Sequence, residues 1–541
     1  MATPMTASLP SALALLLLTA APLLPEQLLQ NGDFVETDAA GLSKSWQLVA
    51  FRDSPKPQVE RVAEDGRTAC RLTFAEDAPA WCVSFSQPLP QLDVEGSLVV
   101  RFAIKPQTAK PRMLSVNLSA TPGCSLPCAR HFLGDLRQGE WQEVEARFPL
   151  RGMKATGSVV EFIAERAFTA GDRVSLTDVH VEQEEPPPLV LRLTAPVSGV
   201  VFTDAPSQAL AGIVRVSRKP AGRQVRLSLL SAATLQEPVS IQVFTATYPR
   251  TPWRLDLAAA PAGKYEVRAE LIDDAGAVTQ SERQVCWRLQ PTPTTTRVVG
   301  GNVCVGSEPI LLLGTYHVSD WAVAATNAES RRIGAPERTR DELLGGLARQ
   351  GFNAFLYTSR VPPPAFLEAA GRHGLHVIPA VAGIGREWGG APLSEELAPW
   401  TDDPRLFGWG GRDEPSPTTT DSASQVYRGL KSLAPRKLVF TSFCAADALD
   451  FFEGENTAAD LILMDIYRVR AADSDLSEVG SQVRRAVQYV REHGSLAVGV
   501  APQAFIYGGP EPTPEQLRAQ LYLGVVNGAR AFFLYSYTRE G

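Results

Sequence analysis

The sequence predicts a multidomain protein in which two all-β sandwiches precede a (β/α)8 barrel. Two proline-rich seams, at residues 184–188 and 290–296, divide the 541-residue chain into three segments. The first two segments carry short alternating strands between Pro/Gly turns, and the third alternates apolar strands with amphipathic helices. A chain of this length is also too long for one hydrophobic core.

Residues 1–26 have the features of a signal peptide. A leucine-rich apolar stretch at 12–21 ends in small residues, and Pro22 follows. The stretch is too short to span a membrane, so we expect a protein that is secreted, periplasmic or attached to the cell surface, with no membrane span in the mature chain. No Lys or Arg precedes the stretch, so a misplaced start site and a lipid-facing anchor are the alternatives.

Residues 27–185 are expected to form the first sandwich. Runs such as 81–86 and 97–104 alternate apolar and polar residues, and no long stretch has helical periodicity. Three tryptophans either lie in the core, which we favour, or are exposed to bind a ligand: Trp46, Trp81 and Trp141.

Residues 189–290 are expected to form the second sandwich, which we interpret as a spacer. The segment 253–257 is typical of a strand, 261–271 of a tight turn and a strand, and 273–276 of a hairpin turn. No pattern of chemical groups stands out in it.

Residues 297–541 are expected to form the barrel. The predicted strands are 310–315, 352–358, 375–380, 406–414, 437–443, 460–467, 496–505 and 530–537. Between them lie amphipathic patterns such as 339–350, which Gly351 terminates. Eight strands in a segment of this size match a (β/α)8 barrel, and an open doubly wound sheet is the alternative. The sequence given stops soon after the eighth strand, so we expect either that it is truncated or that another element takes the place of the eighth helix.

Charge and cysteine content narrow the range of partners. The formal net charge is −7 and no long basic run is present, so we expect no nucleic-acid partner. No zinc-like Cys/His spacing and no HExxH motif occur, so we expect no metal and no other cofactor. Cysteines 70 and 82, and 124 and 128, either pair as local disulfides in an oxidising compartment or are buried thiols.

The most informative segment is 406–415, an apolar run that ends in Asp413, Glu414 and Pro415. A buried parallel strand is a continuous apolar segment, and the proline ends it, so both carboxyls should lie at the C-terminal mouth of the barrel. A partly desolvated carboxylic acid there is the usual general acid for cleaving a glycosidic bond. We expect burial and the neighbouring Asp413 to raise the pKa of Glu414.

Further acidic, amide and aromatic side chains should converge on the same mouth from other strands. We expect Asp465 to join the catalytic groups, as a substrate ligand, a base or a structural ion pair. The predicted substrate-binding residues are Tyr316, His317, Trp409, Arg412, Tyr467, Gln503, Tyr535 and Tyr537. Such a set suits a carbohydrate, since aromatic faces stack on sugar rings and polar groups bind hydroxyls.

The third segment resembles glycoside-hydrolase TIM barrels of the β-galactosidase and cellulase superfamily. The stretches that carry the resemblance are 313–317, 351–355, 407–415, 460–467 and 528–537. The resemblance implies that Glu414 is the acid/base and that the nucleophile is a glutamate at the end of strand seven. The ends of the first sandwich, 29–34 and 172–182, resemble carbohydrate-binding modules of the galactose-binding jelly-roll type. The turn before Tyr265 resembles that of immunoglobulin-like domains.

The sequence departs from that pattern at strand seven, where Gln503 cannot act as a carboxylate nucleophile. Three accounts follow. Glu511 supplies the nucleophile; Asp465 acts as base in an inverting reaction; or Asp413 and Glu414 work as in substrate-assisted hexosaminidases, in which the aspartate steadies the acetamido group of the substrate. A secreted glycoside hydrolase is the predicted function, and a non-catalytic glycan-binding or surface protein with a degenerate barrel is the rival. A lyase has no motif in its favour.

Overall fold

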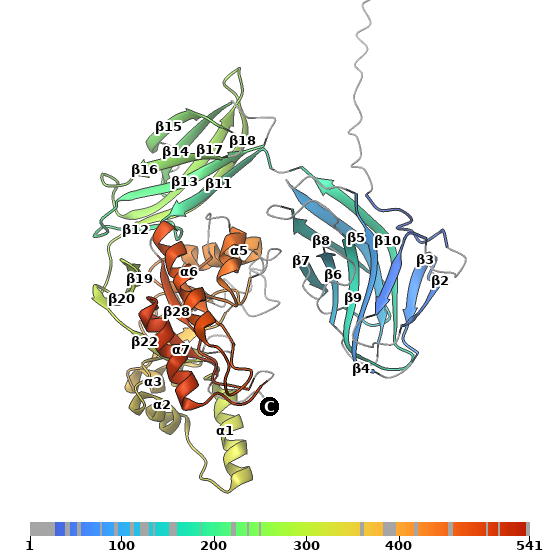
Figure 1. Cartoon of the computed structure of the whole chain (residues 1–541). Helices are drawn as coiled ribbons and strands as arrows, with labels where there is room; N and C mark the ends of the chain where they lie inside the picture. The colour runs from blue at the N-terminus through green and yellow to red at the C-terminus, as the bar shows by residue number, and fades with distance from the viewer. Residues whose placement is uncertain are drawn as a thin grey trace, which may run out of the picture.

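The computed structural model of the chain contains three bodies in chain order (Figure 1). The residues that the structure describes are 28–37, 44–50, 56–75, 78–90, 96–108, 113–119, 129–133, 136–150, 159–185, 187–217, 223–234, 237–247, 250–357, 362–381, 397–415, 420–452, 458–493, 496–506 and 509–536. The predicted leader, Tyr537 and the cysteines at 124 and 128 lie outside them.

The first body is a sandwich of two antiparallel five-stranded sheets. One sheet has the order β1 (Gln47–Ala50), β4 (Ala78–Pro88), β9 (Val159–Phe168), β6 (Met113–Ser119), β7 (Ala129–Leu133). The other has the order β2 (Gln58–Glu64), β3 (Arg67–Thr73), β10 (Arg173–Glu184), β5 (Ser97–Gln107), β8 (Gln142–Pro149). The sheets share one core, in which Phe102 of β5 meets Phe162 of β9 edge to face, with ring centroids 4.8 Å apart.

The tryptophans of this sandwich differ in their surroundings. Trp46 is only 3% exposed and stacks on Phe85 at 4.8 Å, which confirms a core position. Trp141 is half-buried beneath the guanidinium of Arg67, 5.5 Å from the ring centroid. The side chain of Trp81 lies outside the described part of the structure. Trp46 is therefore unavailable to a ligand.

The second body is a smaller sandwich. Its sheets have the orders β11 (Leu189–Ala195), β13 (Ala209–Val216), β16 (Arg250–Asp256) and β12 (Val200–Phe202), β18 (Val278–Leu289), β17 (Gly263–Ile272), β14 (Gln224–Ser231), β15 (Pro238–Thr245). The Tyr265 hydroxyl donates to the Pro261 carbonyl oxygen at 2.6 Å, the bond typical of a tyrosine corner in immunoglobulin-like domains. The strands predicted on both sides of this turn are confirmed.

The third body is a parallel barrel with all eight predicted strands. In sheet order they are β24 (His376–Pro379), β23 (Ala354–Tyr357), β22 (Leu312–Thr315), β29 (Ala531–Leu534), β28 (Ala497–Val500), β27 (Leu461–Met464), β26 (Leu438–Phe443), β25 (Gly408–Gly410). Bridges Val377↔Leu406 and Ala380↔Gly410 join the two ends, and the Phe407 N–H donates to the Val377 carbonyl oxygen at 2.9 Å. The ring is closed, so the alternative of an open doubly wound sheet is wrong.

Helices cover the outside of the barrel. Those in the described residues are α1 (Asp320–Ile333), α2 (Arg340–Arg349), α3 (Pro364–Arg372), α5 (Thr420–Leu433), α6 (Ser477–His493) and α7 (Pro514–Val526), with the short 3-10 helices η1 (Ala398–Trp400) and η2 (Ala446–Phe452). The predicted helix at 339–350 is α2, which a capping box between Thr339 and Glu342 starts. None of the described helices is both long and apolar enough to cross a membrane.

A small sheet closes the floor of the barrel, opposite the mouth. Its strands are β19 (Thr296–Val299), β20 (Asn302–Val305) and β21 (Glu308–Pro309). Val303 of β20 belongs to the same apolar cluster as the interior barrel residues Leu438 and Phe533. Sequence patterns did not predict this sheet, because its strands are only two to four residues long.

The second sandwich packs against the floor side of the barrel. Arg297 of β19 binds the carboxylate of Asp204 with both terminal nitrogens, at 2.5 and 2.7 Å. Val197 enters the apolar layer between the barrel strands and helices. These contacts leave the opposite end of the barrel as the mouth where functional groups can gather.

Candidate active site at the mouth of the barrel

Asp413 and Glu414 extend from the end of β25, where the backbone continues to bond to β26. The Gly411 N–H donates to the Phe440 carbonyl oxygen at 2.7 Å, and the Glu414 N–H to that of Ser442 at 3.1 Å. Glu414 has a φ of 41°, in the left-handed region that non-glycine residues rarely adopt. Backbone of this kind is concentrated at functional sites. His317, across the mouth, has a φ of 61°.

Asp465 faces Glu414 from the end of β27. Its N–H donates to the Phe443 carbonyl oxygen at 3.1 Å, and its side chain is buried, with 6% exposed. The carboxyls of Glu414 and Asp465 hydrogen-bond to each other. Burial and the charge of Glu414 hold the pKa of Asp465 well above its usual range, and desolvation raises the pKa of Glu414. Both carboxyls therefore lose their protons at a higher pH than free carboxyls do.

Asp413 is tied to the first strand of the barrel through Ser442. The Tyr316 hydroxyl oxygen lies 2.9 Å from Ser442 Oγ, and Ser442 hydrogen-bonds Asp413. Desolvation raises the pKa of Asp413, while the Ser442 bond and the charge of His317 oppose this rise. Asp413 also helps raise the pKa of Glu414, so all three carboxyls form one electrostatic unit.

Five rings form an aromatic wall beside the carboxyls: Tyr316, His317, Tyr467, Phe505 and Tyr535. Tyr535 is at its centre, with ring centroids 4.9 Å from His317 and from Phe505, 5.1 Å from Tyr316 and 5.6 Å from Tyr467. Burial and Asp413 raise the pKa of Tyr316; burial and Asp465 raise that of Tyr467. The wall and the carboxyls are therefore neighbours, and these phenols stay protonated.

The structure brings together most of the residues predicted for the site. Those at the mouth are Tyr316, His317, Asp413, Glu414, Asp465, Tyr467 and Tyr535. Arg412 is half-buried in the same loop as Asp413. Sequence reasoning missed three members: Ser442, Cys444 and Phe505. Ser442 is the next-to-last residue of β26 and Cys444 follows the strand directly, so the same strand-end rule could have found them.

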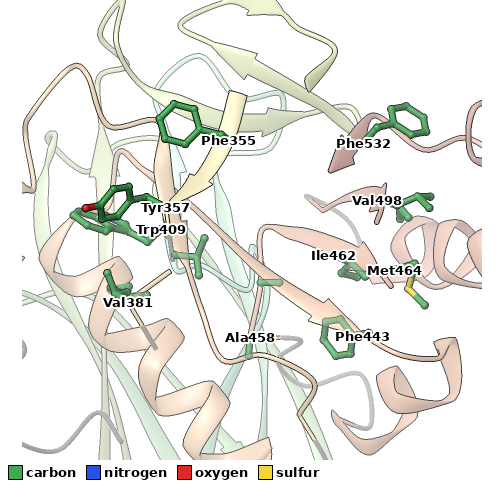
Figure 2. Close-up of a cluster of buried hydrophobic side chains, with 14 of the residues drawn as sticks. Phe355, Tyr357, Val381, Trp409, Phe443, Ala458, Ile462, Met464, Val498 and Phe532 are labelled. Carbon is green, nitrogen blue, oxygen red and sulfur yellow. The ribbon is translucent and has the colours of Figure 1, made fainter. Parts of the chain in front are cut away.

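Trp409, predicted to bind substrate, lies elsewhere. Its side chain is 0% exposed and belongs to the apolar layer between strands and helices, with Tyr357 and Val381 (Figure 2). Strand side chains alternate between faces, and Gly408 and Gly410 occupy the interior positions of β25 on either side. A Cβ at Gly410 would lie 3.1 Å from the ring of Phe440, an interior residue. Trp409 therefore packs the barrel and does not reach the mouth.

Gln503 is likewise a packing residue. It is 0% exposed; its Oε1 accepts from the Val469 N–H at 2.9 Å, and its Nε2 donates to the carbonyl oxygens of Val469 and Phe505 at 3.2 Å each. The amide thus joins the loops after β27 and β28. Gln503 is therefore not a substrate-binding residue. The hydrogen bonds of its side-chain amide position Phe505.

Two cavities lie away from this mouth. One of about 20 Å³ is in the core of the first sandwich, between residues such as Phe85 and Leu176. The other, of about 180 Å³, lies between the second sandwich and the barrel floor, beside Arg254, Lys431 and Asp460. Lys431 and Asp460 form a buried ion pair at 3.1 Å, and Tyr427 also donates to Asp460. The polar groups at this second cavity are therefore already paired within the protein.

Within the described residues, no group of three or more His, Cys, Asp or Glu side chains is arranged so that it could hold a metal ion.

Comparison with known proteins yields likenesses to solved structures alone. No protein-family model and no curated protein matches the chain. A β-glucuronidase from Ruminococcus gnavus aligns at 12% identity over 92% of this chain and 93% of its own, with a TM-score of 0.30. A β-galacturonidase from Eisenbergiella tayi aligns at 11% identity over 91% and 89%, with a TM-score of 0.32. A glycosyl hydrolase family 2 member from Bacteroides cellulosilyticus aligns at 14% identity over 84% of this chain and 59% of its own, with a TM-score of 0.30. With TM-scores this low, the function has to be argued from the mouth itself.

Proposed function

We propose that the chain is a glycoside hydrolase in which Glu414 is the general acid. The observation that carries the proposal is the proton-sharing pair of Glu414 and Asp465 beside an aromatic wall, at the mouth of a closed barrel. A carboxylic acid whose pKa is raised by desolvation can protonate a glycosidic oxygen, and the rings supply a face on which a sugar stacks.

Asp465 acts as the buried proton partner of Glu414. In the proposed step the proton passes from Glu414 to the glycosidic oxygen, the bond between that oxygen and the anomeric carbon breaks, and its electrons stay on the leaving oxygen. The water that is consumed in the hydrolysis supplies the proton that restores the pair. An inverting base lies about 6.5–9.5 Å from the acid. Asp465 is hydrogen-bonded to Glu414 and is therefore too close for that role.

Asp413 supplies a negative charge that stabilises the transition state. Positive charge develops on the sugar ring in the transition state, and a fixed carboxylate nearby stabilises it. Ser442 and Tyr316 orient the Asp413 side chain for this purpose. Two routes stay compatible with such a role: attack by water, or attack by a neighbouring group of the substrate. Glu511, the other acid predicted as nucleophile, is exposed in the segment 509–513 ahead of α7.

We also propose export through the leader at residues 1–26, and a sugar-binding, jelly-roll role for the first sandwich. Exposed surface of that sandwich would have to supply the ligand contacts, because Trp46 belongs to its core.

The test is hydrolysis of a panel of aryl glycosides and polysaccharides by the purified chain and by Glu414→Gln. We expect the substitution to lower kcat/KM about 10²–10⁴-fold, the usual contribution of a general acid. The loss should be largest for alkyl leaving groups and smallest for nitrophenyl groups, which need little protonation. Glu492→Gln, at an exposed position on α6, is the matched control. The anomeric configuration of the first product then separates inversion from retention.

A folded Glu414→Gln protein with full activity on alkyl glycosides would overturn the assignment of the acid. Sugar binding by the wild-type chain without turnover of any glycoside would favour the rival, a glycan-binding protein.

A further inference from the structure

The second sandwich has an open sheet edge at β15. This strand pairs with β14 on one side, and no described strand of the sheet follows it on the other side. Figure 1 shows β15 at the outer margin of the sandwich, on the side away from the barrel. The other edge of the same sheet is β12, which has only three residues and lies beside the barrel floor. An open edge offers unpaired N–H and C=O groups to another strand.

The side chains of β15 make one face of this edge apolar. Val239, Ile241 and Val243 alternate along the strand and are 47%, 53% and 54% exposed. The sheet becomes polar immediately beside them, since Val243 lies opposite Arg226 of β14, which forms an ion pair with Glu270 of β17. Single exposed aliphatic residues are common on protein surfaces. Three in a row along one strand form a continuous apolar stripe at the edge of the sheet.

β15 lacks the devices that usually keep a sheet edge from pairing. Such devices are charged side chains, prolines and β-bulges within the strand. The strand contains no charged residue. Its proline, Pro238, is the first residue, and the register shift against β14 lies opposite that residue, so both affect only the beginning of the strand. The segment that follows, 239–245, therefore has the composition of a strand that can accept a neighbour.

The residue pattern of β15 is symmetric about Ile241. In an antiparallel pair of two such strands centred on this residue, Ile241 of one copy lies opposite Ile241 of a second copy, and Val239 lies opposite Val243 in both directions. All these side chains share a face, because residues two positions apart point to the same side of a strand. Side chains directly opposite each other are in close contact and stabilise a sheet. The strand is therefore complementary to itself.

We propose that β15 pairs with β15 of a second copy of this chain, antiparallel and centred on Ile241, so that their two five-stranded sheets join across a two-fold axis. Both copies use the same strand, so the contact closes as a dimer and does not extend into a fibre. The barrel mouth is at the end opposite the second sandwich, so this contact leaves both mouths open. The inference goes beyond the proposed function and does not depend on it.

The first experiment measures the oligomeric state of the purified full chain. The paired segment is short, so the interface is small and the dimer should be weak. We expect sedimentation velocity to show a monomer at about 1 μM and a dimer fraction that grows up to about 300 μM. The dimer should be the largest species over this range.

Two lysine variants locate the contact. Ile241→Lys places two ammonium groups opposite each other in the pair and should raise the dissociation constant at least about tenfold. Val285→Lys is the matched control, because Val285 is 40% exposed on β18 of the same sheet, away from the β15 edge. This control should leave the dimer unchanged. Both side chains are exposed, and circular dichroism checks that both variants keep the wild-type fold.

Cysteine variants test the register. Residues directly opposite each other have Cβ atoms about 4.5–5.5 Å apart, close to the span of a disulfide. Ile241→Cys should therefore link two copies on mild oxidation, as seen on a non-reducing gel beside the unsubstituted chain. Val243→Cys should not link to itself, because the same residue of the second copy lies four positions away, about 13–14 Å. A mixture of Val239→Cys and Val243→Cys should link again.

Four results would overturn the inference. A chain that stays monomeric over the whole concentration range has no such contact. A dimer that Ile241→Lys leaves intact is formed elsewhere, and one that Val285→Lys also disrupts is formed by the faces of the sheets. Linking of Val243→Cys as strong as that of Ile241→Cys would contradict the two-fold register. Species that grow beyond the dimer with concentration would mean that the contact does not close.

Discussion

The carboxyl groups of Glu414 and Asp465 hydrogen-bond to each other at the mouth of the barrel, although β26 separates the strands that carry them. Main-chain bonds to Ser442 and Phe443 at the end of β26 hold both residues in place. The strand between the two acids thus sets their separation, and it also contributes the Ser442 hydroxyl that reaches Asp413. Proton transfer at this mouth should respond to changes in any of these groups.

Asp413→Asn should shift the alkaline limb of the pH profile. The charge of Asp413 helps raise the pKa of Glu414, so its removal lets Glu414 lose its proton at a lower pH. Since the acid must be protonated to act, kcat/KM should begin to fall at a lower pH than in the wild-type chain. Profiles of both proteins on one aryl glycoside provide the measurement, and an unchanged or higher limb would contradict the coupling.

Asp465→Asn should stabilise the barrel at neutral and alkaline pH. The folded-state pKa of Asp465 is raised, so the stability that its bound proton contributes is complete below the unfolded pKa of about 3.9 and is lost as the pH rises through the folded value. Asparagine does not ionise and avoids that loss. We expect a gain of about 0.5–2 kcal/mol in the free energy of unfolding at pH 8 and no gain near pH 3.5.

Thermal unfolding of Asp465→Asn, of the wild-type chain and of Asp473→Asn, which removes the same charge from an exposed position, checks this prediction at several pH values. A variant less stable than the wild type at pH 8 would mean that the ionised carboxylate is favourably held in the folded protein.

Gln503→Glu should destabilise the chain and restore no nucleophile. A carboxylate cannot make the two donations that Nε2 makes to the carbonyl oxygens of Val469 and Phe505. Leaving those buried acceptors without donors costs about 1–3 kcal/mol each. Comparison with Gln280→Glu, an exposed position on β18, removes the general effect of an added charge. Higher glycosidase activity in Gln503→Glu would show that this side chain reaches the mouth after all.

Cys444 should react slowly with thiol reagents at neutral pH. It is an exposed free thiol just beyond β26, and partial desolvation together with Glu414 and Asp465 raises its pKa to about 11. Because the thiolate is the nucleophile, alkylation by iodoacetamide should accelerate about tenfold for each pH unit between 7 and 10. Cys444→Ser identifies the labelled residue by mass spectrometry, and a sugar bound at the mouth should slow the labelling. A rate that is already fast and constant from pH 7 would place the thiol away from the carboxyls.

Several features could be predicted from single segments of sequence. Each of the eight barrel strands appeared as an apolar run, although the runs extended beyond the strands: the run at 406–414 contains a strand of only three residues, Gly408–Gly410. Apolar side chains at both ends of a run pack against the interior or the helices whether or not their backbone is in the ladder. The amphipathic pattern at 339–350 likewise predicted α2, because helical periodicity depends on neighbours along the chain.

Other features depend on partners far away in the chain. Trp409 and Glu414 belong to one run, yet the alternation of the strand turns Trp409 toward the helices, and a left-handed residue ends the run at Glu414. The amide of Gln503 finds its partners in the loop after another strand. No local pattern encodes such contacts. The sequence therefore predicted Trp409 and Gln503 for the mouth, whereas in the structure both side chains pack inside the protein.

The sequence by itself determined the order of the bodies, the eight strands and the acids and aromatics at their C-terminal ends, since apolar periodicity and strand-stopping residues are local properties. Only the tertiary structure decided which of these side chains meet. The order of β25, β26 and β27 in the sheet brings Glu414 to Asp465, the barrel brings Tyr316 to Ser442, and burial raises the pKa of the carboxyls. A proton is shared at the mouth because burial favours the neutral form of a carboxyl, and burial is a property of the folded chain.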